Sequence, residues 1–318
     1  MAELTVILAS PAGKEYTVNN LTNLEFAAES DAACDGLKLT FLCDKEPFEI
    51  HTVTLFCGEE KVFFGYCDKQ KYSTFGDGYT VFLYARSSAA LLVDNEAQPS
   101  VYYAPGTAVL CRCEAKPFGF RDCLPALAIT QEYIVSKGTS CYGAINHLVR
   151  FLTDRSVRVS PDNALYLPEG RGTVNLDDET VVSETKCINR ALPFTQIDYK
   201  VDGDSAYIRH YKSRLAEERG IRRTRKVNIA ALPLWQREHA LRSRLQNACE
   251  KYMETKVVID GIRFFPLFDK VEFAASKTGL NGAYHLHKIT VLHHADKSET
   301  HLTFRKKLDL KEVNYVAE

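Results

Sequence analysis

The fold is decided by two strand-like runs and the turn between them: Lys61-Val62-Phe63-Phe64-Gly65-Tyr66, Gly76-Asp77-Gly78 and Tyr79-Thr80-Val81-Phe82-Leu83-Tyr84. Both runs are rich in β-branched and aromatic residues, which favour strands, and the two glycines favour a turn. Similar runs precede them at residues 38–43 and 51–56. This spacing predicts antiparallel hairpins that close into a small barrel or sandwich. A short helical or turn-like segment at residues 87–97 is expected to lead out of it.

The next stretch has a different pattern. A strand is predicted at Tyr133-Ile134-Val135, and a helix is predicted to follow it. Thr139 or Ser140 is placed to cap the N-terminus of this helix. Apolar residues at spacings of three and four define one face of that helix: Cys141, Ala144, Ile145, Leu148, Val149 and Leu152. Residues 157–168 then predict two short strands around a turn.

Strands return after residue 181, interrupted by one long helix. Pro233 suits the first turn of this helix, and Leu234, Leu241, Leu245, Ala248 and Tyr252 would share one face. A helix of about 20 residues is about 30 Å long, which is enough to cover one side of a barrel. Closing strands are predicted near residues 271–273, 283–292 and 299–304.

Composition excludes several classes of protein. The 318 residues include 40 Lys and Arg against 41 Asp and Glu, a formal net charge of −1, and 45% are hydrophobic. A polycationic nucleic-acid binder and an acidic disordered tail are therefore not expected. The N-terminus lacks the basic segment of a signal peptide, and no run approaches the roughly 20 apolar residues that span a bilayer. A chain of this length usually forms two or three domains.

The ten cysteines are scattered, and most lie in apolar, strand-like runs. With no export signal, they are expected to be reduced and buried, as small hydrophobic residues. Cys111-Arg112-Cys113 is the one close pair, and strand alternation would place both thiols on one face. Paired C-x2-C zinc knuckles are absent from the sequence.

Motifs for catalysis are also missing from the sequence: no G-x-S-x-G elbow, no P-loop, no G-x-G-x-x-G after a strand and no H-E-x-x-H. Asp177-Asp178-Glu179 is interpreted as a solvated turn. Asp198, Asp202 and Asp204 around Gly203 resemble a calcium loop only loosely, because the bidentate Glu is missing, and a hairpin turn is favoured. Neither an enzymatic activity nor a cofactor is predicted.

Two clusters remain as candidate sites. Arg219, Arg222, Arg223, Arg225 and Lys226 place five cations in eight residues. They could form a phosphate- or DNA-facing patch, but neighbouring glutamates, the neutral chain and the lack of interleaved aromatic residues favour a solvated or intersubunit face. Five histidines lie within 17 residues: His285, His287, His293, His294 and His301. His285 and His287 are expected to share a strand face and could contribute to a metal site, although a structural or pH-sensitive surface is favoured.

The order of several short motifs resembles the baseplate hub proteins of contractile phage tails and phage-tail-like bacteriocins, the late-control-protein-D-like and Mu-type group. The motifs are residues 62–68, Tyr84-Ala85-Arg86-Ser87 and residues 91–97 (Leu91-Leu92-Val93-Asp94-Asn95-Glu96-Ala97), then residues 133–140, 219–227 and 279–286. Each is weak alone, and together they cover nearly the whole chain in the family's order. Tyr133–Ser140 is also similar to the start of a LysM module, with Thr139 in place of the usual Asp and no second helix.

The resemblance implies a β-rich α+β fold with two tail-tube-like antiparallel β-barrel domains, a middle α/β module and one long flanking helix. The expected domains are residues 1–104, residues 105–180, and residues 181–318 with the helix at 233–254. It implies a structural hub that forms a homotrimer and joins the hexameric tail tube protein to the trimeric spike protein, among other baseplate proteins. Such a late virion structural protein would be assembled in the cytoplasm of the bacterial host. It would have no lytic activity, membrane partner or specific nucleic-acid partner, although the genome could pass through its lumen.

Two other interpretations stay open. The first is a peptidoglycan- or carbohydrate-binding tail-associated protein whose binding module is centred on residues 130–170. The second is an enzyme whose site combines residues that are distant in the sequence, which a motif search does not exclude.

Overall fold

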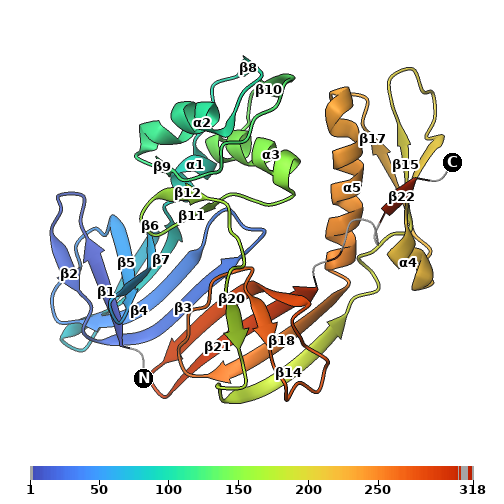
Figure 1. Ribbon diagram of the computed structural model, residues 1–318. Coiled ribbons are helices and arrows are strands. Elements are labelled where there is room, and N and C mark those ends of the chain that lie inside the picture. Colours follow the sequence, from blue (N-terminus) through green and yellow to red (C-terminus); the bar gives the residue numbers. More distant parts are fainter. Residues whose placement is uncertain (1–2, 307, 309–313, 317–318) are drawn as a thin grey trace.

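The computed structural model describes residues 3–306, 308 and 314–316, and its largest feature is one continuous sheet (Figure 1). The N-terminal strands are β1 Leu4–Ala9, β2 Glu15–Thr17, β3 Leu21–Glu29, β4 Gly36–Cys43, β5 Thr52–Cys57, β6 Glu60–Phe75 and β7 Gly78–Ser87. The strands that join them from the C-terminal part are β13 Thr173–Asn175, β14 Val181–Ile188, β18 Met253–Asp260, β19 Lys270–Glu272, β20 Tyr284–His294 and β21 Lys297–Lys306. Apart from the strand expected at residues 111–113, the predicted strands are present, and the β-rich α+β class is confirmed.

The strands of the two predicted barrels belong to this one sheet because β20 pairs antiparallel with β3. Along the sheet the order is β14-β18-β21-β20-β3-β4-β7-β6-β5-β1-β2, with the short β13 and β19 beside it. The apolar residues of both parts share one core, in which the Phe26 ring lies 6.2 Å from Phe63 and 5.3 Å from Phe264. The domain boundaries at residues 104 and 180 stay a prediction.

Alternation decides which strand residues enter this core. In β4, Leu37, Leu39 and Phe41 are buried, and their neighbours in sequence are more exposed. At Gly65 in β6, an added Cβ would lie 2.1 Å from the carbonyl oxygen of Arg86 in β7. Glycine is therefore required there, because β6 and β7 approach each other closely beside a bulge.

The middle region builds a second core around helix α3, Cys141–Thr153. Ser140 caps α3 as predicted, since its hydroxyl accepts a hydrogen bond from the Gly143 N–H. The other elements here are α1 Ala90–Asp94, β8 Ser100–Tyr103, α2 Thr107–Leu110, a π-helical turn Cys111–Ala115, a 3-10 turn Lys116–Phe118, β9 Arg121–Asp122, β10 Glu132–Val135, β11 Arg158–Val159 and β12 Ala164–Tyr166.

The prediction of a strand at Cys111-Arg112-Cys113 was wrong. These residues form the π-helical turn, so Cys111 points into the second core and Cys113 is exposed. The ten thiols are all free, but only Cys111, Cys141 and Cys249 are buried. The expectation that the cysteines are generally buried was therefore also wrong, because strand edges and turns leave the other side chains partly or fully exposed.

A third core lies between the long helix α5, Leu234–Glu250, and a four-stranded sheet in the order β17-β15-β16-β22 (Figure 1). These strands are β15 Gln196–Lys200, β16 Arg209–Ser213, β17 Thr224–Asn228 and β22 Asn314–Val316, with α4 at Arg214–Glu218. Leu241 and Leu245 are buried against this sheet, and Leu234 is 80% exposed. The predicted helix is present but shorter than residues 233–254, because Met253 already begins β18.

Among the described residues, no helix is both long enough and apolar enough to cross a membrane. The turn at Asp177–Glu179 and the hairpin loop around Gly203 are present as predicted.

Candidate functional site

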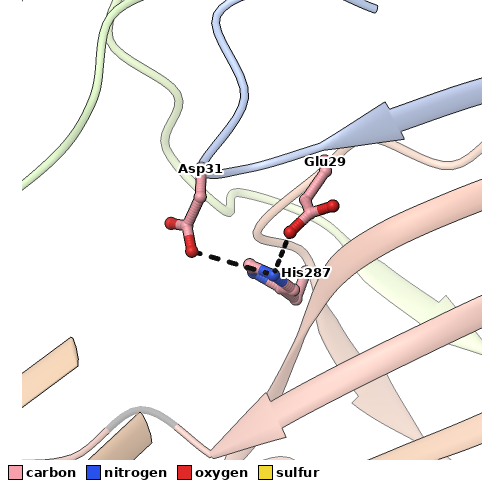
Figure 2. Close-up of side chains that lie close together, drawn as sticks. All are labelled: Glu29, Asp31 and His287. Carbon is pink, nitrogen blue, oxygen red and sulfur yellow. Dashed lines mark hydrogen bonds and ion pairs between the residues drawn. The ribbon is translucent and has the colours of Figure 1, made fainter. Parts of the chain in front are cut away.

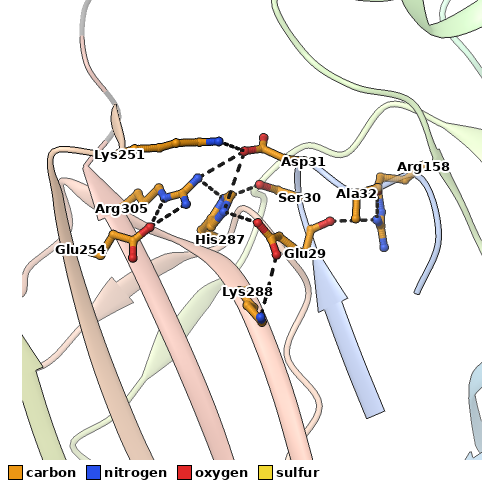
Figure 3. Close-up of polar contacts among 10 residues, drawn as sticks. All are labelled: Glu29, Ser30, Asp31, Ala32, Arg158, Lys251, Glu254, His287, Lys288 and Arg305. Carbon is orange, nitrogen blue, oxygen red and sulfur yellow. Dashed lines mark hydrogen bonds and ion pairs between the residues drawn. The ribbon is translucent and has the colours of Figure 1, made fainter. Parts of the chain in front are cut away.

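A polar network surrounds the end of β3, where the first and last thirds of the chain meet (Figure 3). Glu29 ends β3 and lies opposite Lys288 of β20. A bulge between Leu286 and Lys288 interrupts the alternation of β20, so that Leu286 and His287 are both buried. The bulge turns the His287 ring toward the β3–β4 connection rather than leaving it on a solvated face.

His287 is held by both of its ring nitrogens. Its Nδ1 lies 2.5 Å from Ser30 Oγ and 3.3 Å from Arg305 Nη1, and its Nε2 lies 3.3 Å from Glu29 Oε1. Because a guanidinium can only donate, Nδ1 accepts and the ring hydrogen is on Nε2, where it is directed to Glu29. Burial, and then the Arg305 charge, lower the pKa of His287 below its usual value of about 6.5. The ring is therefore neutral at pH 7.

Glu29, Asp31 and His287 are the one group of three metal-ligating side chains found within the described residues (Figure 2). His287 Nε2 lies 3.3 Å from Glu29 Oε1 and 3.9 Å from Asp31 Oδ2. Two ligand atoms of a tetrahedral zinc ion are about 3.3 Å apart, so the spacing suits a small cation. His285, the other predicted metal ligand, is not a member of this group.

The surrounding charges oppose a metal ion at this position. Arg305 lies 3.3 Å from Asp31 and 2.5 Å from Glu254, Lys251 lies 3.9 Å from Asp31, and Lys288 lies 3.9 Å from Glu29. These cations already neutralise the carboxylates. A metal on Nε2 would also force the ring hydrogen onto Nδ1, against the Arg305 donor. The arrangement is best suited to joining segments of the chain.

The middle region reaches the same β3–β4 connection through Arg158. Arg158 Nη1 donates to the carbonyl oxygens of Glu29 at 3.0 Å and Ala32 at 2.6 Å, and Nη2 pairs with the Asp35 carboxylate. Burial disfavours the charged guanidinium, but Asp35 outweighs this effect, so the pKa of Arg158 lies above its usual range. Three parts of the chain therefore hold one short connection.

The sequence patterns did not indicate Glu29, Asp31, Asp35, Arg158 or Arg305. One signal was available: Arg158 stands between Val157 and Val159 in a buried run, and a charge in such a run requires a partner. The partner itself is more than 100 residues away, and no local pattern points to it.

A cleft of about 820 Å³ opens beside the network, between α3, α5 and β20, and both His285 and His287 line it. Asp154 and Ser243 also line the cleft, and His239 Nε2 lies 3.0 Å from Asp154 Oδ1 and 3.3 Å from Ser243 Oγ. This is not a hydrolytic triad, in which Ser and Asp contact different ring nitrogens. Instead Asp154 ends α3 and pairs with His239 and Arg242 of α5, and Phe151 packs on Trp235 at 4.5 Å. These contacts fix α5 against the middle region.

The predicted cation cluster does not line this cleft and lies on β17 and on the loop between α4 and β17. Arg219, Arg222, Arg223, Arg225 and Lys226 are all exposed. Aromatic residues from elsewhere pack on two of them, which the local sequence did not indicate: Arg219 lies 5.9 Å from the Tyr252 ring and Lys226 5.9 Å from the Tyr207 ring. The structure thus separates the two predicted clusters.

No family model and no curated protein matches the chain. Solved structures do match it over almost its whole length. A 43 kDa tail protein of prophage MuSo2 from Shewanella oneidensis has a TM-score of 0.77 at 15% identity, covering 97% of this chain and 99% of that one. A tail protein from Neisseria meningitidis MC58 has a TM-score of 0.75 at 12% identity, covering 95% and 96%. The chain has the fold of these tail proteins.

A more distant match is a component of a secretion system. The E. coli c3393 protein, a type VI secretion system component with structural similarity to the T4 bacteriophage tail proteins gp27 and gp5, has a TM-score of 0.58 at 11% identity. That match covers 94% of this chain and 76% of the other. The expected resemblance to the phage-tail fold is confirmed.

Proposed function

We propose that this chain is the structural hub of the baseplate of a contractile phage tail or a related injection particle. Three copies would form a ring that joins the hexameric tail tube to the trimeric spike, as an assembled part of the particle made in the bacterial cytoplasm. The observation that carries the proposal is the match to tail proteins across 97% of the chain, with all three cores included.

The organisation of the chain supports a rigid structural role. One sheet runs through the first and last thirds of the chain, and the network around residues 29–35 fixes the middle region to that sheet. The Ser243, His239 and Asp154 contacts have a geometry suited to packing rather than to nucleophilic catalysis. A non-enzymatic adaptor accounts for these features.

Multi-angle light scattering and capture experiments test the proposal. A hub is expected to have three times the 35.8 kDa chain mass and to bind purified tube and spike proteins from the same particle. A chain that stays monomeric at high concentration and binds neither partner would refute it. Retention on purified cell wall without binding to tube or spike would instead support the peptidoglycan-binding alternative.

A further inference from the structure

The near-zero net charge of the chain conceals an acidic N-terminal third and a basic C-terminal part. Residues 1–104 contain 7 Lys and Arg against 15 Asp and Glu, whereas residues 181–318 contain 25 against 17. Their formal net charges are therefore −8 and +8, and residues 105–180 are almost balanced, with 8 against 9. Such a separation creates a strong dipole in a molecule that has little total charge.

The positive charge concentrates on the subdomain of residues 189–230, which has 10 Lys and Arg against 5 Asp and Glu. Three of its carboxylates form ion pairs with cations other than those at residues 219–226: Asp202 with Arg237, Asp204 with Arg209 and Glu218 with Arg214. We call the exposed cations Arg219, Arg222, Arg223, Arg225 and Lys226 the basic surface.

Within the basic surface, three side chains already have local contacts. Arg223 donates to the Ala191 carbonyl, and Arg219 and Lys226 lie over tyrosine rings. In the described part of the chain, the side chains of Arg222 and Arg225 are exposed and make no hydrogen bond or ion pair, although the Arg225 backbone pairs within the sheet. These two guanidinium groups are therefore available to a partner.

Exposed carboxylates gather at the opposite end of the sheet, and we call them the acidic rim: Glu15, Asp44, Glu46, Glu49 and Asp77. Three neighbouring segments carry them. Glu15 in β2 pairs with Ala9, which pairs in turn with the start of β5, and residues 44–51 lead into β5. Asp77 lies in the β6–β7 turn, beside the end of β4 that precedes Asp44. The same segments carry only Lys14 and Lys45 as cations.

The two surfaces cannot meet within one chain. Strand β2 is at one end of the sheet, and β14, which leads into the basic subdomain, is at the other (Figure 1). Direct contact between the two complementary surfaces therefore requires a second molecule. We propose that the basic surface of one copy docks on the acidic rim of a second copy, head to tail. This inference rests on the proposed function, because a head-to-tail contact that closes after three copies gives a ring.

A second copy fits the basic surface better than nucleic acid does. Each copy carries both surfaces, and the net charges of residues 1–104 and 181–318 are equal and opposite. A polyanion such as DNA would be repelled by residues 1–104, which have a net charge of −8. Attraction between exposed charges acts over about 10 Å at 0.1 M salt and about 3 Å at 1 M. Assembly through these surfaces should consequently weaken as salt is raised.

A charge-swap experiment tests the inference on the full-length chain. Arg222→Glu with Arg225→Glu should raise the protein concentration needed for assembly at least tenfold, measured by light scattering at 0.1 M salt. Adding Glu46→Arg and Glu49→Arg to that variant should restore assembly, because the charges are again opposite. The matched control, Arg112→Glu with Lys116→Glu in the middle region, changes the charge equally and should assemble like wild type.

Each other result has a definite meaning, with circular dichroism confirming that every variant folds. If the Arg222/Arg225 variant assembles like wild type, the inference is overturned and the hub proposal stands. If the fourfold variant does not recover, the acidic rim is not the partner and the inference fails. Binding of duplex DNA that this Arg variant loses, with assembly unchanged, assigns the basic surface to nucleic acid and overturns the inference. A wild-type monomer that binds neither tube nor spike overturns the hub proposal as well.

Discussion

Replacing Arg158 with methionine should destabilise the protein more than any substitution of an exposed charge. The Arg158 side chain is only 4% exposed, and that of its partner Asp35 is 16% exposed. Arg158→Met would leave a buried carboxylate and the carbonyls of Glu29 and Ala32 without their donor. Removing one partner of a buried pair typically costs about 3–5 kcal/mol, so the free energy of unfolding should fall by about that amount.

Urea unfolding followed by the fluorescence of Trp235, the single tryptophan, measures this loss, because Trp235 packs on Phe151 where α5 meets the middle region. Asp35→Asn with Arg158→Met should cost less than the sum of the two single changes, since the double variant strands no charge. The control is Arg171→Met, whose ion pair with Glu169 is exposed, so this change should alter the free energy of unfolding far less than Arg158→Met does. A loss of 1 kcal/mol or less for Arg158→Met would refute the role of this pair in fixing the middle region.

Three further predictions concern the same sheet and network. Because the pKa of His287 is lowered in the folded protein, the unfolded chain takes up a proton at this residue first as the pH falls. The free energy of unfolding should therefore decrease below about pH 6.5. His287→Gln should reduce this decrease, which urea unfolding at a series of pH values measures. Zinc at 100 μM should leave the melting temperature unchanged, whereas a rise of several degrees that His287→Gln abolishes would show that Glu29, Asp31 and His287 form a metal centre. Gly65→Ala should lower the melting temperature by several degrees because the added Cβ would clash with the β7 backbone. The control Gly282→Ala should leave the melting temperature unchanged, since its Cβ would have no neighbour within 4 Å. Equal melting temperatures for the two variants would contradict the close approach of β6 and β7.

Local patterns predicted most of the elements, for identifiable physical reasons. The strands around Phe63 and Val81 and the capped helix after Ser140 depend on alternation, helical spacing and a side-chain cap, which are properties of neighbouring residues. The strand prediction at Cys111 failed because a short helical turn and a strand can contain the same few apolar residues. Pairing of β3 with β20 joins residues more than 250 apart, and periodicity contains no information about that choice.

The candidate site was harder to predict for the same reason. His287 was found because histidines cluster in the sequence, but its burial results from a bulge that shifts the register of β20. The cation cluster was found from composition alone, and its significance depends on where the acidic residues lie. The net charge of the whole chain does not reveal this, because the charges of residues 1–104 and 181–318 cancel.

The position of the polar network follows from the way in which the sheet is joined. In a seam formed only by β3 and β20, a slip of one residue would turn Phe26 out of the core, but a slip of two residues would keep the same strand face buried. A bulge with a buried imidazole between Ser30, Glu29 and Arg305 is satisfied in one register only, because each donor needs its own acceptor. The network therefore adds specificity at the seam, and the Arg158 pair extends it to the middle region, so that all three parts of the chain are fixed relative to one short connection.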